Sequence, residues 1–189
     1  IEAYRDVLSV EQDNDVALTA LEQLFTDTGQ WHELIDIYEQ QLSTAHEPGE
    51  QVELHGKIAA IWEEELDDPD RALEAYNQVL VADPDNTDAM RELERLYGEL
   101  DRPFDKVETL QRHVDAVEQP VQKVDLLNEL ARVQRDELED PHAALEAYSR
   151  SLEVEREQPN ILFDQAELHE ETQNWESAIE AYGQLAELL

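Results

Sequence analysis

An internal repeat is the feature that most constrains the fold of this chain. Residues 66–76 recur as residues 138–148, and both copies end in the run Leu-Glu-Ala-Tyr. The spacing between successive anchor residues alternates between 34 and 38 residues. These anchors are Tyr4, Tyr38, Tyr76, Leu110, Tyr148 and Tyr182. Such a period predicts stacked structural repeats, each of which buries its apolar face against its neighbours.

Each repeat contains two amphipathic stretches. In residues 87–100 the apolar side chains recur at steps of three and four, which places them on one face of a helix. Residues 72–81 show the same pattern. Asp68 and Asp140 each precede a proline, an arrangement typical of the start of a helix. The sequence therefore predicts about eleven helices and no sheet.

A repeated helix pair of about 34 residues resembles the tetratricopeptide repeat, and the resemblance covers the whole chain. That family places a small residue early in its second helix, four positions before an aromatic one. Its first helix carries a large apolar residue seven positions before an aromatic one. The matching pairs are Ala72 with Tyr76, Ala144 with Tyr148, Ala178 with Tyr182, Leu18 with Phe25 and Met90 with Tyr97. The resemblance implies an all-α, right-handed superhelical solenoid of antiparallel helix pairs.

The repeat boundaries predict one solenoid over residues 1–189. The 38-residue repeats should have a longer first helix and a longer loop before it, at residues 46–50. Both ends look uncapped, so we expect a piece of a longer array of bacterial type, or ends that associate with other copies. The predicted segments are a trailing second helix at 1–12 and helix pairs at 13–46, 47–84, 85–118, 119–157 and 158–189.

Some positions depart from the family pattern. Glu22 and Glu94 stand where a small residue is usual in the first helix, and Lys106 does so in a second helix. We expect these places to pack loosely or to expose the charged side chain. The register puts the aromatic residues at contacts between helices, where they should pack in the core. The three tryptophans included in this expectation are Trp31, Trp62 and Trp175.

The chain carries a formal net charge of −35, from 48 acidic and 13 basic residues. This charge disfavours nucleic acid and anionic membrane surfaces as partners. It would attract a basic partner, or equally serve solubility in high salt. No apolar run reaches the ~18 residues of a membrane span. With no targeting segment in this window, the sequence favours the cytoplasm, and the absence of Cys excludes disulfides.

No pattern in the chain predicts catalysis, a cofactor or a metal. The six His lack ligand spacing, and residues 32–36 begin like a zinc-protease motif without its second His. Residues 83–88 are similar to a calcium loop, but the Gly of its sharp turn is missing, and the repeat explains them as a turn. We therefore predict a chain that is not an enzyme.

The resemblance also implies a candidate binding site. In tetratricopeptide arrays the first helices line a concave groove that contacts extended peptides. The register implies that Arg91 and Arg95 face this groove from one helix, and Asn128, Arg132 and Arg135 from the next. Arginine suits recognition of a carboxylate, and asparagine can bind a peptide backbone.

A plainer alternative stays open for the arginines. Three of the four have an acidic residue four positions on, and such pairs are ordinary on helix surfaces, at ~0.2–0.5 kcal/mol each. The pairs are Arg95 with Glu99, Arg132 with Asp136, and Arg135 with Glu139.

The sequence as a whole predicts a protein–protein interaction scaffold that binds a peptide or a partner protein. Two alternatives remain: an array that assembles with itself through its ends, and a regulatory arm of a larger protein. The identity of the partner is not encoded in any motif of the chain.

Overall fold

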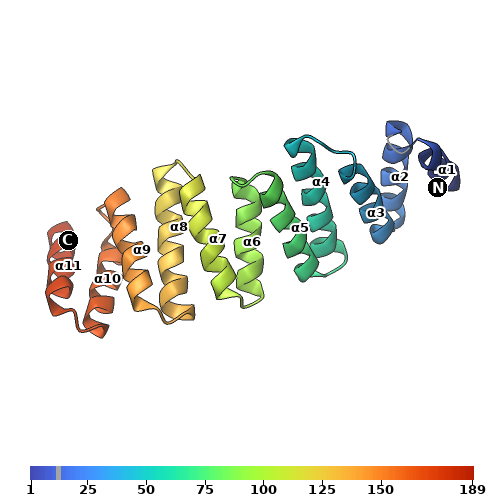
Figure 1. Cartoon of the computed structure of the whole chain (residues 1–189). Coiled ribbons are helices and arrows are strands. Elements are labelled where there is room, and N and C mark those ends of the chain that lie inside the picture. The colour runs from blue at the N-terminus through green and yellow to red at the C-terminus, as the bar shows by residue number, and fades with distance from the viewer. Residues whose placement is uncertain (12–13) are drawn as a thin grey trace. The chain divides into compact units, whose positions relative to one another are not determined.

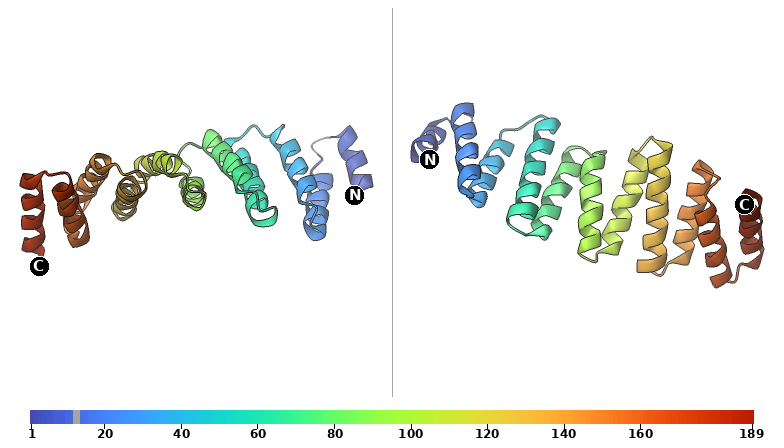
Figure 2. Two further views of the ribbon diagram at one scale, coloured as in Figure 1. Left: turned by 90° about the horizontal axis from the view of Figure 1, so that it is seen from below. Right: turned by 180° about the vertical axis from the view of Figure 1, so that it is seen from behind.

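The computed structural model describes residues 1–11 and 14–189, which form eleven α-helices and two π-helical turns and contain no strand (Figures 1 and 2). This confirms the predicted all-α fold of helix pairs. The helices are α1 (Glu2–Val10), α2 (Asp15–Thr28), α3 (Trp31–Leu42), α4 (Pro48–Ala60), α5 (Pro69–Ala82), α6 (Thr87–Glu99), α7 (Pro103–Ala116), α8 (Pro120–Arg132), α9 (Pro141–Val154), α10 (Pro159–Glu171) and α11 (Trp175–Leu188), with the π-helical turns η1 (Ile61–Glu65) after α4 and η2 (Val133–Glu137) after α8.

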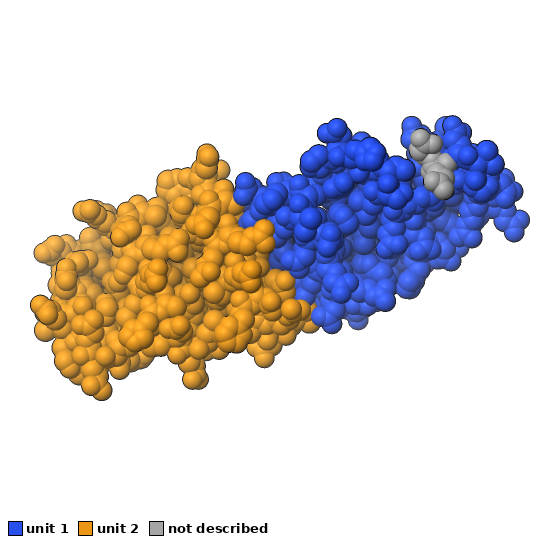
Figure 3. All heavy atoms as spheres, in the orientation of Figure 1, with its two compact units in different colours: residues 1–96 blue, residues 97–189 orange. Residues whose placement is uncertain are grey.

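The chain divides into two compact units, which Figure 3 colours separately. Unit 1 is Ile1–Leu96 and unit 2 is Tyr97–Leu189, so the division falls within α6. The single solenoid over the whole chain stays a prediction, and each unit is described by itself below. The predicted boundary between residues 12 and 13 lies outside the described residues.

Proline and N-capping side chains start the helices where the sequence predicts. Asp68 accepts a hydrogen bond from the Arg71 backbone N–H (3.2 Å), and Asp140 accepts one from the Ala143 N–H (3.0 Å). Each carboxylate satisfies one of the four N–H groups that a helix start leaves unpaired. The proline that follows is tolerated because its missing N–H would have had no partner. Both predicted caps are confirmed.

The long first helices of the 38-residue repeats end in a π-helical turn. In η1 the Leu66 N–H donates to the Ile61 carbonyl (3.1 Å), and in η2 Leu138 donates to Val133 at the same distance. Each π-helical turn ends two residues before a residue with a positive φ of 52°, which is Asp67 after η1 and Glu139 after η2. Because α4 begins at Pro48, the added length lies at the carboxyl end of the helix, so the predicted longer loop at residues 46–50 is wrong in part.

Each unit has its own apolar core between first and second helices. In unit 1 Leu21, Phe25 and Ala59 are fully buried, and in unit 2 Ala131 and Tyr148 are. Burial of one large side chain contributes about 1.5–3 kcal/mol to stability. The small alanines let neighbouring helices approach closely, as expected from the register.

The charged residues at small-residue positions remain between the helices, where polar groups of neighbouring helices contact them. Glu94 is buried, so of the two expected outcomes, loose packing or exposure, exposure is wrong for this residue. Glu22 accepts a hydrogen bond from the Tyr38 hydroxyl (2.7 Å), and the largely buried Lys106 Nζ lies 2.7 Å from a Glu129 oxygen. The paired charges offset the cost of removing these groups from water.

Trp175 is the clear exception among the tryptophans. Trp31 and Trp62 pack against the core of unit 1, as predicted. Trp175 is 60% exposed, so the prediction of core packing is wrong for it. Its helix, α11, packs on α10 through Ala178 and Ala181, which are buried, while the indole stays outside this contact.

Candidate functional site

The predicted site residues all lie on first helices, but in two separate units. Arg91 and Arg95 are on α6 in unit 1, while Asn128 and Arg132 on α8 and Arg135 on η2 belong to unit 2. The two groups are therefore described in turn.

Arg135 links two first helices of unit 2. Its Nε donates to Asp136 Oδ1 (2.6 Å), and its guanidinium lies 3.9 Å from Asp164 Oδ1 on α10. The hydrogen bond to Asp136 raises the pKa of the Arg135 guanidinium above its usual range. The predicted pairing with Glu139 does not form, because the π-helical turn takes that residue off the face of Arg135.

A cavity of about 440 Å³ lies beside this ion pair, between η2 and α10. Its wall carries four carboxylates and one guanidinium, so the balance of charge favours a cationic group. The lining residues are Arg135, Asp136, Asp164, Glu167, Leu168 and Glu171. Sequence reasoning did not find this cavity, because the acidic side chains come from two helices that are separated along the chain by α9.

Tyr148 is fully buried, and within the described part of the chain its hydroxyl group has no hydrogen-bond partner. Burial raises the pKa of Tyr148 to about 12, against the opposing effect of the Arg135 charge. The negative charge of Asp164 adds to the increase. The hydroxyl therefore stays protonated, and it lies within electrostatic range of residues that line the cavity.

Asn128 belongs to a buried polar network. Its Nδ2 donates to Gln158 Oε1 (2.9 Å), and Gln158 Nε2 donates in turn to the backbone carbonyls of Ser151 (3.1 Å) and Glu155 (2.8 Å). Asn128 Oδ1 is buried without a partner. The network ties α8 to the segment before α10, so Asn128 holds the two first helices in position.

Arg132 is less constrained than Arg135, the other predicted arginine of unit 2. Its side chain is more than half exposed, and its guanidinium lies 3.8 Å from a Glu129 carboxylate oxygen on the same helix. The predicted partner, Asp136, is bonded to Arg135 instead. The Arg132 guanidinium can therefore take a second carboxylate.

The two arginines of unit 1 differ in the same way. Arg91 is exposed and pairs with Asp88 (2.9 Å) on its own helix. Arg95 bonds to Glu92 (2.9 Å) and also to Glu63 on η1, so it bridges two first helices. In each unit one arginine is thus held between helices and another projects from the surface.

The bridging ion pairs have opposite polarity in the two units. In unit 1 η1 supplies the acid, Glu63, and α6 supplies the base, Arg95. At the corresponding positions of unit 2, 72 residues later, η2 supplies the base, Arg135, and α10 carries Glu167. The bridge to α10 runs to Asp164, the copy of Glu92. The contact between first helices is retained while its charges are exchanged.

A second cavity, of about 310 Å³, lies between α2 and α4 in unit 1. Its wall includes Glu22, Glu53 and Lys57. Lys57 Nζ lies 2.8 Å from Glu53, 3.8 Å from Glu22 and 5.4 Å from the centre of the Tyr38 ring. This cavity therefore already contains a lysine of the chain, held by two carboxylates and an aromatic ring.

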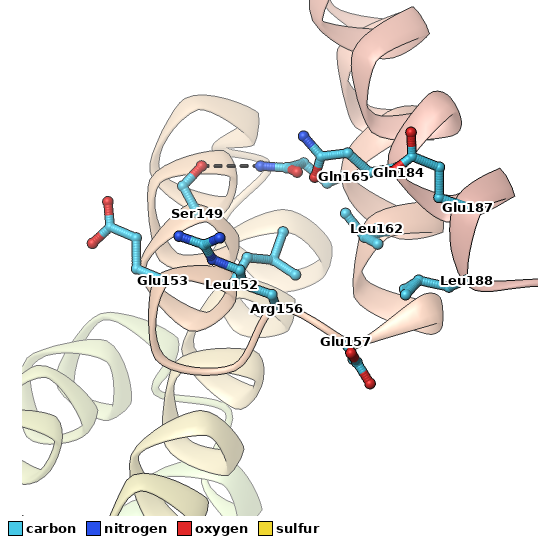
Figure 4. A pocket seen from close by; sticks show the side chains of 10 residues that line it. All are labelled: Ser149, Leu152, Glu153, Arg156, Glu157, Leu162, Gln165, Gln184, Glu187 and Leu188. Carbon is cyan, nitrogen blue, oxygen red and sulfur yellow. Dashed lines mark hydrogen bonds between the residues drawn. The ribbon is translucent and has the colours of Figure 1, made fainter.

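A third cavity, of about 640 Å³, is lined by residues of α9, α10 and α11 in unit 2 (Figure 4). Leu152 and Leu162 form apolar parts of its wall, and Gln165 Nε2 donates to Ser149 Oγ (2.9 Å) across it. Glu153, Glu157 and Glu187 place carboxylates near it. Sequence reasoning, which looked only at first helices, missed this cavity.

Two further observations concern the described parts of the chain. Within residues 1–11 and 14–189, no three His, Cys, Asp or Glu side chains are placed to hold a metal ion together. Among the same residues, no helix has the length and apolar character that a membrane span requires.

Comparison with known proteins gives matches in both units. Residues 17–52 and 134–188 each match a family model described as tetratricopeptide repeat. A crystal structure of MamA is similar with a TM-score of 0.53 and 17% identity, over 89% of this chain and 94% of that one. The structure of YrrB, a "TPR protein with an unusual peptide-binding site", gives 0.53 and 14%, over 98% and 92%. The Pseudomonas aeruginosa protein pilF gives 0.50 and 20%, over 93% and 78%.

No curated protein matches the chain in sequence. The likeness to solved structures shows the fold, which serves in general as a scaffold for protein–protein interaction. The family models match residues in both units, and the helices follow one another in the pairs that this repeat requires. The chain belongs to the tetratricopeptide repeat family.

Proposed function

We propose that the chain is a non-catalytic scaffold that binds an extended segment of a partner protein on the first-helix face of unit 2. The observation that carries this proposal is the cavity between η2 and α10 with the exposed Arg132 on the adjoining helix α8. A groove with both charges on its wall can hold a peptide by its side chains and fix its direction.

The predicted site residues take different parts in this proposal. Arg132 contacts the ligand, because its guanidinium can bind a carboxylate through two parallel hydrogen bonds. Arg135 and Asn128 position the two first helices, since the structure already engages both in bonds within the unit. The four carboxylates of the cavity accept a basic side chain of the same segment.

Unit 1 offers a second site of the same design. Arg91 is the exposed contact residue, and Arg95 is the positioning residue that bridges α6 and η1. YrrB, with its peptide-binding site on a similar fold, supports the choice of a peptide as ligand. All five predicted residues thus keep a role in binding.

A displayed library of random peptides tests the proposal. We expect selection on the whole chain to enrich peptides with both an acidic and a basic residue, and Arg132→Ala to weaken their binding by about tenfold, the loss of one charge-assisted pair of ~1.4 kcal/mol. Fluorescence anisotropy of a selected peptide measures this change.

Arg150→Ala is the matched control. Arg150 lies on the second helix α9, where its ion pair with Asp115 (3.8 Å) is as loose as that of Arg132. Its removal should leave peptide affinity unchanged. Equal binding by wild type and Arg132→Ala, or an equal loss in both variants, would rule out the first-helix face of unit 2 as the site.

A further inference from the structure

The cavity between η2 and α10 lies at a place that unit 1 fills with one of its own side chains. Its lining residues on η2 and α10 are copies, 72 residues later, of residues on η1 and α6. The pairs include Glu63 with Arg135, Glu92 with Asp164, and Arg95 with Glu167. The guanidinium group that α6 supplies at this place in unit 1 is therefore replaced by a carboxylate on α10.

The tyrosine of the intervening second helix supports this correspondence. Tyr76 of α5 and Tyr148 of α9 are copies of each other. In unit 1 burial and then the charges of Glu63 and Glu92 raise the pKa of Tyr76 to about 12, while the charge of Arg95 opposes them. In unit 2 the charges at the copies of Glu63 and Glu92 also act on the pKa of Tyr148. Each tyrosine is therefore close to the same pair of first-helix positions.

Arg95 shows how this place holds a guanidinium group in unit 1. Its Nε and Nη2 donate to Glu92 on the same helix, at 3.0 and 2.9 Å, and Nη2 also donates to Glu63 on η1. One planar group thus meets carboxylates from two first helices. A lysine ammonium lacks the fork that makes these contacts together, and it is more strongly hydrated. The place therefore favours arginine over lysine.

In unit 2 the same place has carboxylates that no base has taken up. Among the residues that the structure describes, no hydrogen bond or ion pair engages the carboxylate of Glu167 or Glu171. Arg135 donates to Asp136 on its own turn (2.6 Å), and it lies 3.9 Å from Asp164, which is beyond hydrogen-bond distance. Four carboxylates share this one guanidinium, so a second one would still leave the cavity negative.

A polar atom beside this cavity also has no partner. Tyr148 is fully buried, and within the described ranges its hydroxyl group makes no hydrogen bond. It belongs to the same cluster of buried side chains as Leu168, which lines the cavity. Charges from both walls, on Arg135 and Asp164, act on the tyrosine. The hydroxyl group is therefore directed toward the cavity, where an N–H donor would supply its missing bond.

We propose that the cavity between η2 and α10 is an arginine subsite for the peptide of the proposed function, on which this inference rests. The guanidinium group of the peptide takes the place that Arg95 has in unit 1. Glu167 and Glu171 bind it from α10, and Leu168 supplies the apolar part of the wall. The subsite thus adds a requirement for arginine, which a general attraction to the net charge of the chain would not create.

Two small probes test the subsite without the rest of a peptide. They are N-acetyl-arginine methylamide and N-acetyl-lysine methylamide, which have the same charge and the same backbone. Each is titrated into the isotope-labelled whole chain at physiological ionic strength, where distant charges are screened. We expect the arginine probe to shift amide resonances of η2 and α10 saturably, and to bind about tenfold more tightly than the lysine probe.

Glu167→Arg should abolish binding of the arginine probe, because it restores the residue that unit 1 has at this position. The matched control is Glu146→Arg on α9, an exposed residue outside the cavity that gives the same change in net charge. It should leave the affinity within about twofold of wild type, since screening weakens its effect at the cavity. Circular dichroism checks that both variants keep their helical content.

Four results would overturn the proposal. They are no saturable shift, equal affinities for the two probes, shifts that lie outside η2 and α10, and an equal loss in the two variants. The last three would mean that the net charge alone attracts the probe.

The outcome can be separated from that of the proposed function. Selected peptides that need Arg132 but show no preference for arginine would overturn the subsite alone. An arginine probe that binds as expected, together with peptides indifferent to Arg132→Ala, would overturn only the contact residue of the proposed function.

Discussion

Tyr38 and Tyr148 are buried to a similar extent in the two units, but their hydroxyl groups meet different partners. Tyr38 donates a hydrogen bond to Glu22, and Tyr148 has no partner for its hydroxyl. A buried hydroxyl without a partner loses its bonds to water and gains nothing in return. Comparison of the two residues therefore separates two effects on the free energy of unfolding. One is the stabilisation by a hydrogen-bonded hydroxyl group, and the other is the cost of burying a hydroxyl group without a partner.

We expect Tyr38→Phe to lower the free energy of unfolding by about 1.5 kcal/mol, the contribution of a hydrogen bond to a charged group. Tyr148→Phe should leave it unchanged or raise it by up to about 1 kcal/mol, since the variant removes an unsatisfied polar atom. Urea unfolding followed by circular dichroism measures both. A loss for Tyr148→Phe as large as that for Tyr38→Phe would show that the Tyr148 hydroxyl has a partner in solution.

At the scale of elements, the bridge between first helices is the feature that distinguishes the two units. Unit 1 joins Glu63 to Arg95, and unit 2 places Arg135 near Asp164 and Glu167. The backbone positions are copies, so the two arrangements should be interchangeable if both residues change together.

We expect Arg135→Glu to lower the free energy of unfolding by about 1 kcal/mol, because it adds a carboxylate to a cavity that already has four. The double variant Arg135→Glu with Glu167→Arg recreates the polarity of unit 1 and should recover most of this loss. Thermal and urea unfolding of the single and double variants measure the coupling. No recovery in the double variant would mean that the two bridges depend on different backbone geometry.

The helix pairs and their starts could be predicted from the sequence because both depend on local information. Apolar spacing defines the helices, and Asp68 and Asp140 mark starts by themselves. The π-helical turns were not predicted, since they depend on how one inserted residue shifts the hydrogen bonds of a whole turn.

The candidate site was harder to predict because its contacts join distant parts of the chain. The sequence shows which acid lies four residues from Arg135, but not that Asp164 of another helix reaches it. The burial of Trp175 was also hard to predict, because it depends on distant parts of the chain. Its local pattern matches that of Trp31, and only the presence or absence of a covering helix decides whether the ring is buried.

At the scale of the whole molecule, the net charge of −35 sets the dependence of stability on salt. With 48 acidic and 13 basic residues, most carboxylates have no opposite charge to pair with. Their repulsion acts on the folded chain more strongly than on the unfolded one, because folding brings the charges together.

We expect the midpoint of thermal unfolding to rise by about 4–8 °C between 10 mM and 1 M NaCl, the shift that ~2 kcal/mol gives in a chain of this size. Over this range the screening length falls from ~30 Å to ~3 Å. Differential scanning calorimetry measures the midpoint, and KCl at equal ionic strength is the control for screening. A midpoint that does not move with salt would show that the acidic residues do not repel one another appreciably.

The exchanged charges of the two bridges also bear on how a chain of near-identical repeats finds its correct neighbours. Repeat proteins are prone to misassembly, because similar segments can substitute for one another while they fold. If η1 were to settle against α10, Glu63 would meet Asp164 and Glu167, and like charges would oppose the wrong pairing. The exchanged charges thus make the pairing of η1 with α10 less favourable than its pairing with α6, where Glu63 meets Arg95.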